Sequence, residues 1–104
     1  MPYARINGCN LYYEDHGGQG ETIVFAHSVL WSGEMFEAQV RAFKEHYRCI
    51  TFDFRGQGRS EVAGNGYEIE CLADDTVRLF EALNCAPCHL VGVSLGGIVG
   101  MHTV

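Results

Sequence analysis

The nine residues HLVGVSLGG (89–97) decide the fold class of this chain. Residues 89–93 form a short, mostly apolar run of the kind found in a buried strand, and residues 95–104 form an apolar, helix-like segment. Between them, the sequence matches the pattern G-x-S-x-G around Ser94. A sharp turn from strand to helix strains the backbone of such a serine and presents its hydroxyl above the edge of the sheet. The stretch therefore predicts a serine nucleophile at a strand–turn–helix junction.

The glycines of this motif have a steric purpose. Neighbouring backbones crowd a sharp turn, so only small residues fit at positions 92 and 96, where the chain has glycine. Gly97 is expected to allow the same close approach one residue further on. The N–H of Leu95, at the start of the helix, would point at a developing oxyanion. Taken alone, the motif leaves an ordinary interpretation open, in which Ser94 caps a helix and the glycines serve packing.

Strands and helices alternate upstream of the motif. The apolar pattern and the Asn7-Gly8 turn signal predict strands at 3–6, 9–15, 22–26, 47–54 and 89–93, and helices at 34–46, 68–83 and 95–104. Alternation of this kind implies parallel pairing, right-handed crossovers and helices on both faces. We therefore expect an α/β fold: a mostly parallel, doubly wound sheet with an antiparallel N-terminal hairpin, and residues 1–104 as one partial domain.

Apolar spacing defines the inner face of each expected helix. The first helix would use Ser32 as its cap. Its inner residues would be Met35, Phe36, Val40 and Phe43, and those of the second helix Leu72, Leu79, Phe80 and Leu83. Four acids at the start of the second helix, Glu68, Glu70, Asp74 and Asp75, are more typical of a solvated face that complements the helix dipole than of a metal site.

Composition excludes several classes of function. The 104 residues carry a net charge of −6, which disfavours a nucleic-acid surface, and no run of basic residues marks a membrane patch. No apolar stretch reaches the roughly 20 residues that span a bilayer. The N-terminus shows no signal-peptide pattern, so we expect a cytoplasmic protein. Its five cysteines are then expected to be reduced and mostly buried.

Two further segments follow expected strands. His27-Ser28-Val29 comes after the apolar run 22–26, where the N–H of Val29 could supply the second donor of an oxyanion hole. The sequence DFRGQGRS (53–60) contains G-x-G, but it lacks the third glycine and the following helix of a dinucleotide site. We interpret it as a tight structural turn.

The three motifs together resemble the α/β-hydrolase fold superfamily. The chain carries His-x-x-x-Trp from His27, Asp-x-Arg-Gly-x-Gly-x-Ser from Asp53 and Gly-x-Ser-x-Gly-Gly from Gly92, in the order and spacing of the N-terminal half of that fold. The N-terminal MPYA and the segment HSVLW (27–31) look closest to 3-oxoadipate enol-lactonases and small esterases or lactonases. Ser28 departs from the His-Gly pattern common in the superfamily. A serine at the elbow argues against haloalkane dehalogenases and epoxide hydrolases, which carry aspartate there.

The resemblance implies roles for particular residues. Ser94 would be the nucleophile, Val29 and Leu95 would give the oxyanion-hole amides, and Gly92 and Gly96 would be the elbow glycines. The substrate would be a small carboxylic ester or lactone, with no metal and no cofactor. Family members carry the catalytic acid and histidine well after the elbow.

The same resemblance predicts that residues 1–104 do not suffice for catalysis. His102 lies about two helical turns from the nucleophile on the same helix, so it cannot fold back as the base. Without a base, a serine hydroxyl is a weak nucleophile. We therefore expect a piece of a serine hydrolase that is inactive alone and needs a C-terminal half.

A second motif points to another class of protein. Cys85-Ala-Pro-Cys88-His89 matches C-x-x-C-H, the pattern of covalent haem attachment, and Met101 could serve as an axial ligand. A redox or haem-binding module that uses these residues is thus the alternative to the hydrolase. Against it, haem attachment normally occurs in exported proteins, and the cysteines precede a strand instead of opening a helix.

Overall fold

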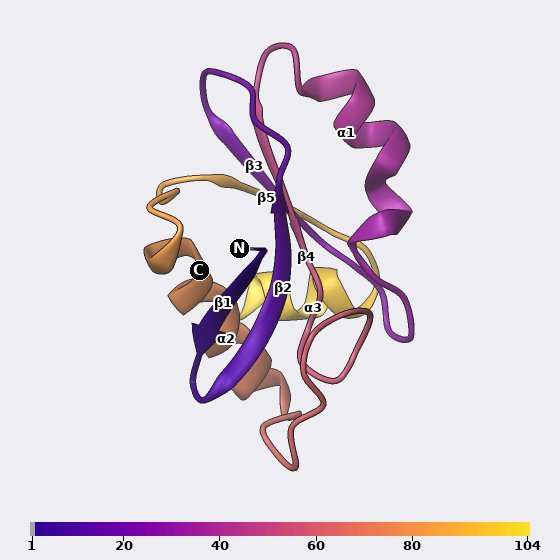
Figure 1. Ribbon diagram of the computed structural model, residues 1–104, viewed down its shortest axis with the longest axis vertical. Coiled ribbons are helices and arrows are strands. Elements are labelled where there is room, and N and C mark those ends of the chain that lie inside the picture. The colour runs from indigo at the N-terminus through magenta and orange to yellow at the C-terminus, as the bar shows by residue number, and fades with distance from the viewer. Residues whose placement is uncertain (1) are drawn as a thin grey trace.

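The computed structural model describes residues 2–104 as a single mixed sheet with helices on both faces (Figure 1). The strands are β1 (Tyr3–Ile6), β2 (Cys9–Asp15), β3 (Thr22–Ala26), β4 (Arg48–Phe52) and β5 (His89–Gly92). The helices are the 3₁₀ turn η1 (Gly33–Phe36), α1 (Glu37–Phe43), α2 (Ile69–Ala82) and α3 (Leu95–Met101). The expected α/β class is confirmed. Within residues 2–104, no helix combines the length and apolar character needed to cross a membrane.

The strands follow the spatial order β1-β2-β4-β3-β5. β3 pairs in parallel with both β4 and β5, and β2 pairs antiparallel with β1 and β4. At the turn between β1 and β2, Asn7 and Gly8 have φ values of 49° and 74°. These left-handed values are what a two-residue hairpin turn requires. The N-terminal hairpin and the parallel crossover region are both as expected.

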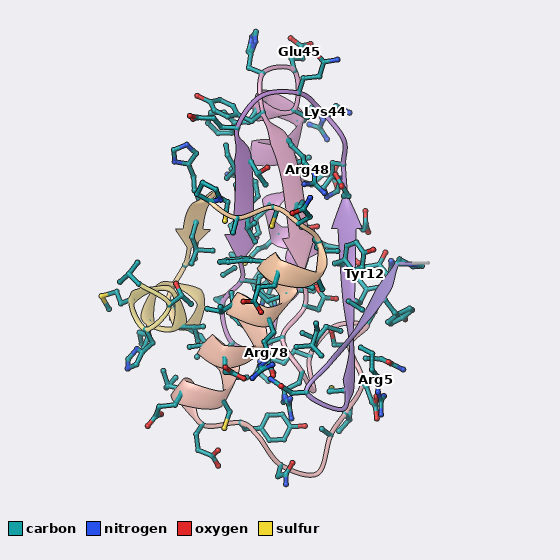
Figure 2. All side chains as sticks on the ribbon, turned by 90° about the vertical axis from the view of Figure 1, so that its left-hand side faces the viewer. Arg5, Tyr12, Lys44, Glu45, Arg48 and Arg78 are labelled. Atoms are coloured by element: carbon teal, nitrogen blue, oxygen red, sulfur yellow. The ribbon has the colours of Figure 1, made fainter. Side chains whose placement is uncertain are left out.

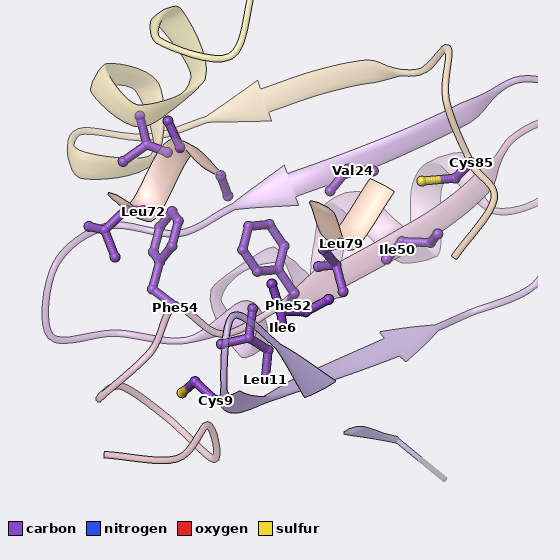
Figure 3. Close-up of a cluster of buried hydrophobic side chains, with 13 residues drawn as sticks. Ile6, Cys9, Leu11, Val24, Ile50, Phe52, Phe54, Leu72, Leu79 and Cys85 are labelled. Atoms are coloured by element: carbon purple, nitrogen blue, oxygen red, sulfur yellow. The ribbon is translucent and has the colours of Figure 1, made fainter. Parts of the chain in front are cut away.

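Successive side chains of a strand point to opposite faces of the sheet. In the central strands, both of these faces are buried. Val24 and Ala26 of β3 contribute to the core under α2 and α3, where Leu72, Leu79 and Val99 also lie (Figure 3). A smaller core lies under α1 on the other face. Its buried members are Ile23, Phe25, Phe36, Val40 and Cys49. The predicted burial of residues 22–26 on both sides is confirmed.

Two expectations about burial are wrong. Phe43 is 43% exposed and does not belong to the inner stripe of α1. The helix opens with the 3₁₀ turn η1, whose three residues per turn shift the phase of the stripe. Within residues 2–104, β5 is not a buried strand: Val91 is 41% exposed, because β3 is the only strand of this range that flanks β5. Figure 2 shows α3 on the side of the molecule opposite Tyr12 and Arg5 of the hairpin.

Asp75 also departs from the expected solvated acidic face. Its carboxylate is buried and receives two hydrogen bonds from Arg55, of 2.7 and 2.9 Å. Asn7 Nδ2 donates a third, of 2.8 Å, from the hairpin turn. The hydrogen bonds to Asp75 raise the pKa of Arg55 further. This ion pair ties α2, the loop after β4 and the N-terminal hairpin together.

We expect Arg55→Met to lower the free energy of unfolding by about 3–5 kcal/mol, because it leaves the Asp75 carboxylate buried without its cation. The matched control is Arg41→Met, which breaks an exposed ion pair with Glu37 on α1. The control should cost less than about 0.5 kcal/mol. Chemical denaturation of both variants measures the difference. Equal losses would show that burial of the Arg55 pair carries no special weight.

Candidate active site

Ser94 stands at the junction of β5 and α3, as the sequence predicts. Its backbone has φ 55° and ψ −111°, a strained conformation for a residue with a side chain. The side chain makes no capping hydrogen bond to α3, so the helix-cap interpretation has no support. The residue is exposed to solvent. The strained turn therefore presents the hydroxyl to solvent at the end of the parallel strands.

Close packing explains the two elbow glycines. A Cβ on Gly92 would lie 2.5 Å from the carbonyl carbon of Gly96, and a Cβ on Gly96 would lie 2.5 Å from that of Ala26. Both contacts are with backbone, which has little freedom to move. Gly97 differs, because a Cβ there would meet Gly92 at an ordinary 3.5 Å. The expected steric need at Gly97 is therefore wrong, since only the two motif glycines face the crowding.

The register of β3 and β5 brings the two predicted oxyanion segments to the same end of the sheet. Ala26 is the partner of Gly92, and the N–H of Val93 donates to the carbonyl of Ala26 at 3.2 Å. Val29 and Leu95 each follow these paired residues by three positions. The carboxyl ends of adjacent parallel strands are where ligands bind in open α/β sheets.

Within residues 28–30, the hydrogen bonds single out one free amide. The N–H of Ser28 points at Met35 Sδ at 3.5 Å, and the N–H of Leu30 donates to Gln57 Oε1 at 2.6 Å. The N–H of Val29 has no acceptor among residues 2–104. Leu95 is the first residue of α3, a position whose N–H has no partner inside the helix. Val29 and Leu95 thus keep the two donors that the sequence predicts for an oxyanion.

The imidazole of His27 is fully buried and holds the loop between β3 and η1. Its Nε2 accepts from the N–H of Phe54 at 3.0 Å, so Nδ1 carries the proton and donates to the carbonyl of Ser28 at 2.6 Å. Burial lowers the pKa of His27, which keeps the ring neutral near pH 7. The Ser28 carbonyl and the Val29 N–H belong to one peptide unit, so this bond orients that N–H.

Asp53 fixes the far end of the same loop. Its carboxylate accepts from the N–H of Gly33 at 2.7 Å and from the N–H of Arg59 at 2.9 Å. The segment 53–60 therefore supports the loop after β3, which agrees with its interpretation as a structural turn. Sequence reasoning missed Gln57 in this segment, because a contact between two loops leaves no periodic signal.

No histidine of the described chain serves Ser94 as a base. Both ring nitrogens of His27 are bonded within its loop, and His102 Nδ1 bonds to the carbonyl of Ile98 at 3.0 Å. The Ser94 hydroxyl has no hydrogen-bond partner anywhere in residues 2–104. What these residues assemble is a candidate nucleophile with two candidate oxyanion donors.

The C-x-x-C-H residues do not converge on an open site. Cys85 is buried, and burial raises the pKa of its thiol to about 11. His89 Nε2 is bonded to Glu21 at 2.8 Å. A neutral thiol is a poor nucleophile and metal ligand. Among residues 2–104, no cluster of three or more histidine, cysteine or acidic side chains could hold a metal ion.

Known proteins resemble this chain in sequence and in fold. A family model described as the alpha/beta hydrolase fold matches residues 16–104. RutD of Pantoea ananatis, which its name assigns to the carbamate hydrolases, is 38% identical over 88% of this chain. The enol-lactonase of Burkholderia xenovorans is 36% identical over 95% of this chain, with a TM-score of 0.90. An epoxide hydrolase of Bacillus megaterium is 30% identical over 97% of the chain, also with a TM-score of 0.90.

The match covers only part of the length of each of these proteins. This chain spans 35% of the length of the RutD protein, 39% of the enol-lactonase chain and 36% of the epoxide hydrolase chain. The region that the family model matches, residues 16–104, includes Ser94, the loop after β3 and the loop after β4.

Proposed function

Because the chain belongs to the α/β-hydrolase fold family, we propose that Ser94 is the nucleophile of a hydrolase that cleaves a carboxylic ester or lactone. The observation that carries this proposal is the strained backbone of Ser94 at the β5–α3 junction, with a hydroxyl that has no hydrogen-bond partner among residues 2–104. A strained residue persists where the surrounding structure holds it, and such residues gather at active sites. The N–H groups of Val29 and Leu95 bind the oxyanion.

The reaction proceeds through an acyl-enzyme. The Ser94 oxygen attacks the carbonyl carbon while its proton passes to a base, and the resulting tetrahedral oxyanion accepts hydrogen bonds from Val29 and Leu95. Collapse breaks the bond to the alcohol oxygen, which takes the proton. In a lactone, this oxygen remains attached to the acyl chain. Water then attacks the acyl carbon and releases the acid and the serine. The reaction needs no metal and no cofactor.

We further propose that the base and its acid partner come from polypeptide beyond residues 1–104. Two observations support this. The Ser94 hydroxyl has no partner among the described residues, and the chain spans only about a third of the length of its relatives. The chain order of the triad in this fold also places the acid and the histidine after the serine. Residues 1–104 alone are then expected to be inactive.

The relatives differ in their reactions, and fold alone does not choose among them. One similar protein is named an enol-lactonase and another an epoxide hydrolase. The elbow residue favours ester or lactone hydrolysis over epoxide hydrolysis. The resemblance described above assigns an aspartate to the epoxide hydrolases at this position, whereas this chain carries Ser94. A serine that forms an acyl ester suits carboxylic esters and lactones.

The cysteines fit a reducing compartment. All five are free in the structure, and Cys9, Cys49 and Cys85 are buried. Disulfides form and persist mainly in oxidising compartments. We therefore propose a cytoplasmic location, with a small-molecule substrate.

Covalent labelling tests the proposed nucleophile. The protein is expressed from the full reading frame that contains residues 1–104 and is treated with a fluorophosphonate, which reacts with activated serines. We expect one phosphonyl adduct, which peptide mass spectrometry maps to Ser94. A protein truncated after Val104 should react far more slowly, because it lacks the base. Labelling at another serine, or equal labelling of both proteins, would contradict the proposal.

A further inference from the structure

Gln57 joins the loop after β4 to the loop after β3. Its side-chain Oε1 accepts a hydrogen bond from the N–H of Leu30 at 2.6 Å. Leu30 follows Val29, so the peptide unit between them is held by Gln57. The peptide unit before Val29 is held by His27 through the carbonyl of Ser28. The two bonds therefore fix Val29 from both sides.

Leu30 needs such a restraint. Its φ is 59°, a left-handed conformation that crowds the Cβ of a leucine against its own backbone. Its side chain is 89% exposed, so packing compensates little for this crowding. Within the described chain, Leu30 makes one hydrogen bond, and this is the bond to Gln57. Without that bond, the loop would be free to relax, and the Val29 N–H would turn with it.

Gln57 is itself well anchored. Its N–H donates to the carbonyl of Phe54 at 3.0 Å, and its carbonyl accepts from the N–H of Ser60 at 3.0 Å. The Ser60 hydroxyl in turn bonds to the carbonyl of Asp53 and accepts from the N–H of Tyr12. The support for the loop thus runs back to β2 and the end of β4. The Gln57 side chain is also uncharged, so it adds no negative charge beside a developing oxyanion.

We propose that Gln57 is a positioning residue, which holds the Val29–Leu30 peptide unit so that the Val29 N–H faces the oxyanion. The proposal rests on the function proposed above for Ser94 and Val29. It gives Gln57, in the DFRGQGRS turn, a role in catalysis in addition to the structural contacts that Asp53 makes from the same turn.

The test uses three variants of the protein expressed from the full reading frame. Gln57→Met keeps the length of the side chain and removes the acceptor, Gln57→Glu keeps an acceptor oxygen, and Gln39→Met is the matched control on the exposed face of α1. For Gln57→Met we expect kcat for p-nitrophenyl acetate to fall about 10- to 100-fold, with KM within about twofold. The affinity for an aryl boronic acid, which mimics the tetrahedral oxyanion, should fall by the same factor as kcat.

Amide hydrogen exchange gives a readout that does not depend on turnover. The Leu30 amide should exchange at least about 10-fold faster in Gln57→Met and stay protected in Gln57→Glu and Gln39→Met. Suppose that hydrolysis depends on Ser94, but Gln57→Met keeps its kcat or loses only KM. Then Gln57 does not position the oxyanion donor, and the proposed function stands. Suppose instead that no hydrolysis depends on Ser94. Then the proposed function is wrong, and the role of Gln57 is wrong with it.

Discussion

Ser94→Ala is expected to lower kcat/KM for ester hydrolysis by a factor of about 10⁴ to 10⁶ in the protein expressed from the full reading frame. The variant keeps the oxyanion donors and the substrate contacts but has no oxygen to form the acyl-enzyme. What remains is the modest rate enhancement of a site that binds and polarises the carbonyl. Steady-state kinetics with p-nitrophenyl acetate measures the loss.

A hydroxyl elsewhere on the same segment provides the control. Thr103 bonds to the carbonyl of Gly100 just after α3, and Thr103→Val should leave kcat/KM within about twofold. The melting temperatures of both variants should stay close to that of the wild type. If Ser94→Ala retained more than about a tenth of the activity, another group would have to be the nucleophile.

Gly96→Ala is expected to cost about 3 kcal/mol or more of unfolding free energy, whereas the same change at Gly97 stabilises by up to about 1 kcal/mol. Both residues lie in α3, where alanine is intrinsically favoured over glycine by about 1 kcal/mol. At Gly96, the added methyl would overlap the backbone of Ala26 in β3, and the strand and helix would have to move apart. At Gly97, the methyl meets only an ordinary contact.

Chemical denaturation of the two variants tests whether their changes in unfolding free energy have opposite signs. Since the pair shares one helix and one substitution, helix propensity cancels and the difference reports the contact with Ala26. Activity should fall with Gly96→Ala, because displacement of α3 moves the Ser94 hydroxyl and the Leu95 N–H together. Equal stability of the two variants would show that the elbow tolerates a side chain at either position.

Local sequence signals predict much of this fold. The Asn7-Gly8 turn, the apolar run 22–26 and the strand–helix alternation each act over a few residues, so they can be recognised without the tertiary structure. Burial is harder to predict, because it depends on what lies next to an element. The apolar composition of β5 resembles that of β3, yet among the described residues β5 has one neighbouring strand and β3 has two. Asp75 resembles its solvated neighbours on α2, yet Arg55 faces it.

The candidate site likewise has one part that the local sequence predicts and one part that depends on tertiary contacts. Ser94, Gly92 and Gly96 belong to one short motif, and their strained turn and close packing follow from local geometry. Gln57 and Leu30 are 27 residues apart in the chain and meet only through the placement of two loops. The left-handed backbone of Leu30 cannot be read from residue types, because it depends on the contact between these two loops.

The buried pair of Arg55 and Asp75 has a consequence for how the molecule opens. A two-stranded edge such as β1–β2 normally frays at low free energy. Here the hairpin turn donates through Asn7 to Asp74 and Asp75 of α2. If the hairpin separates from α2, the buried Asp75 carboxylate loses the hydrogen bond from Asn7, and its ion pair with Arg55 is weakened. We therefore expect the N-terminal edge, the loop after β4 and α2 to unfold as one cooperative unit, although they are far apart along the chain.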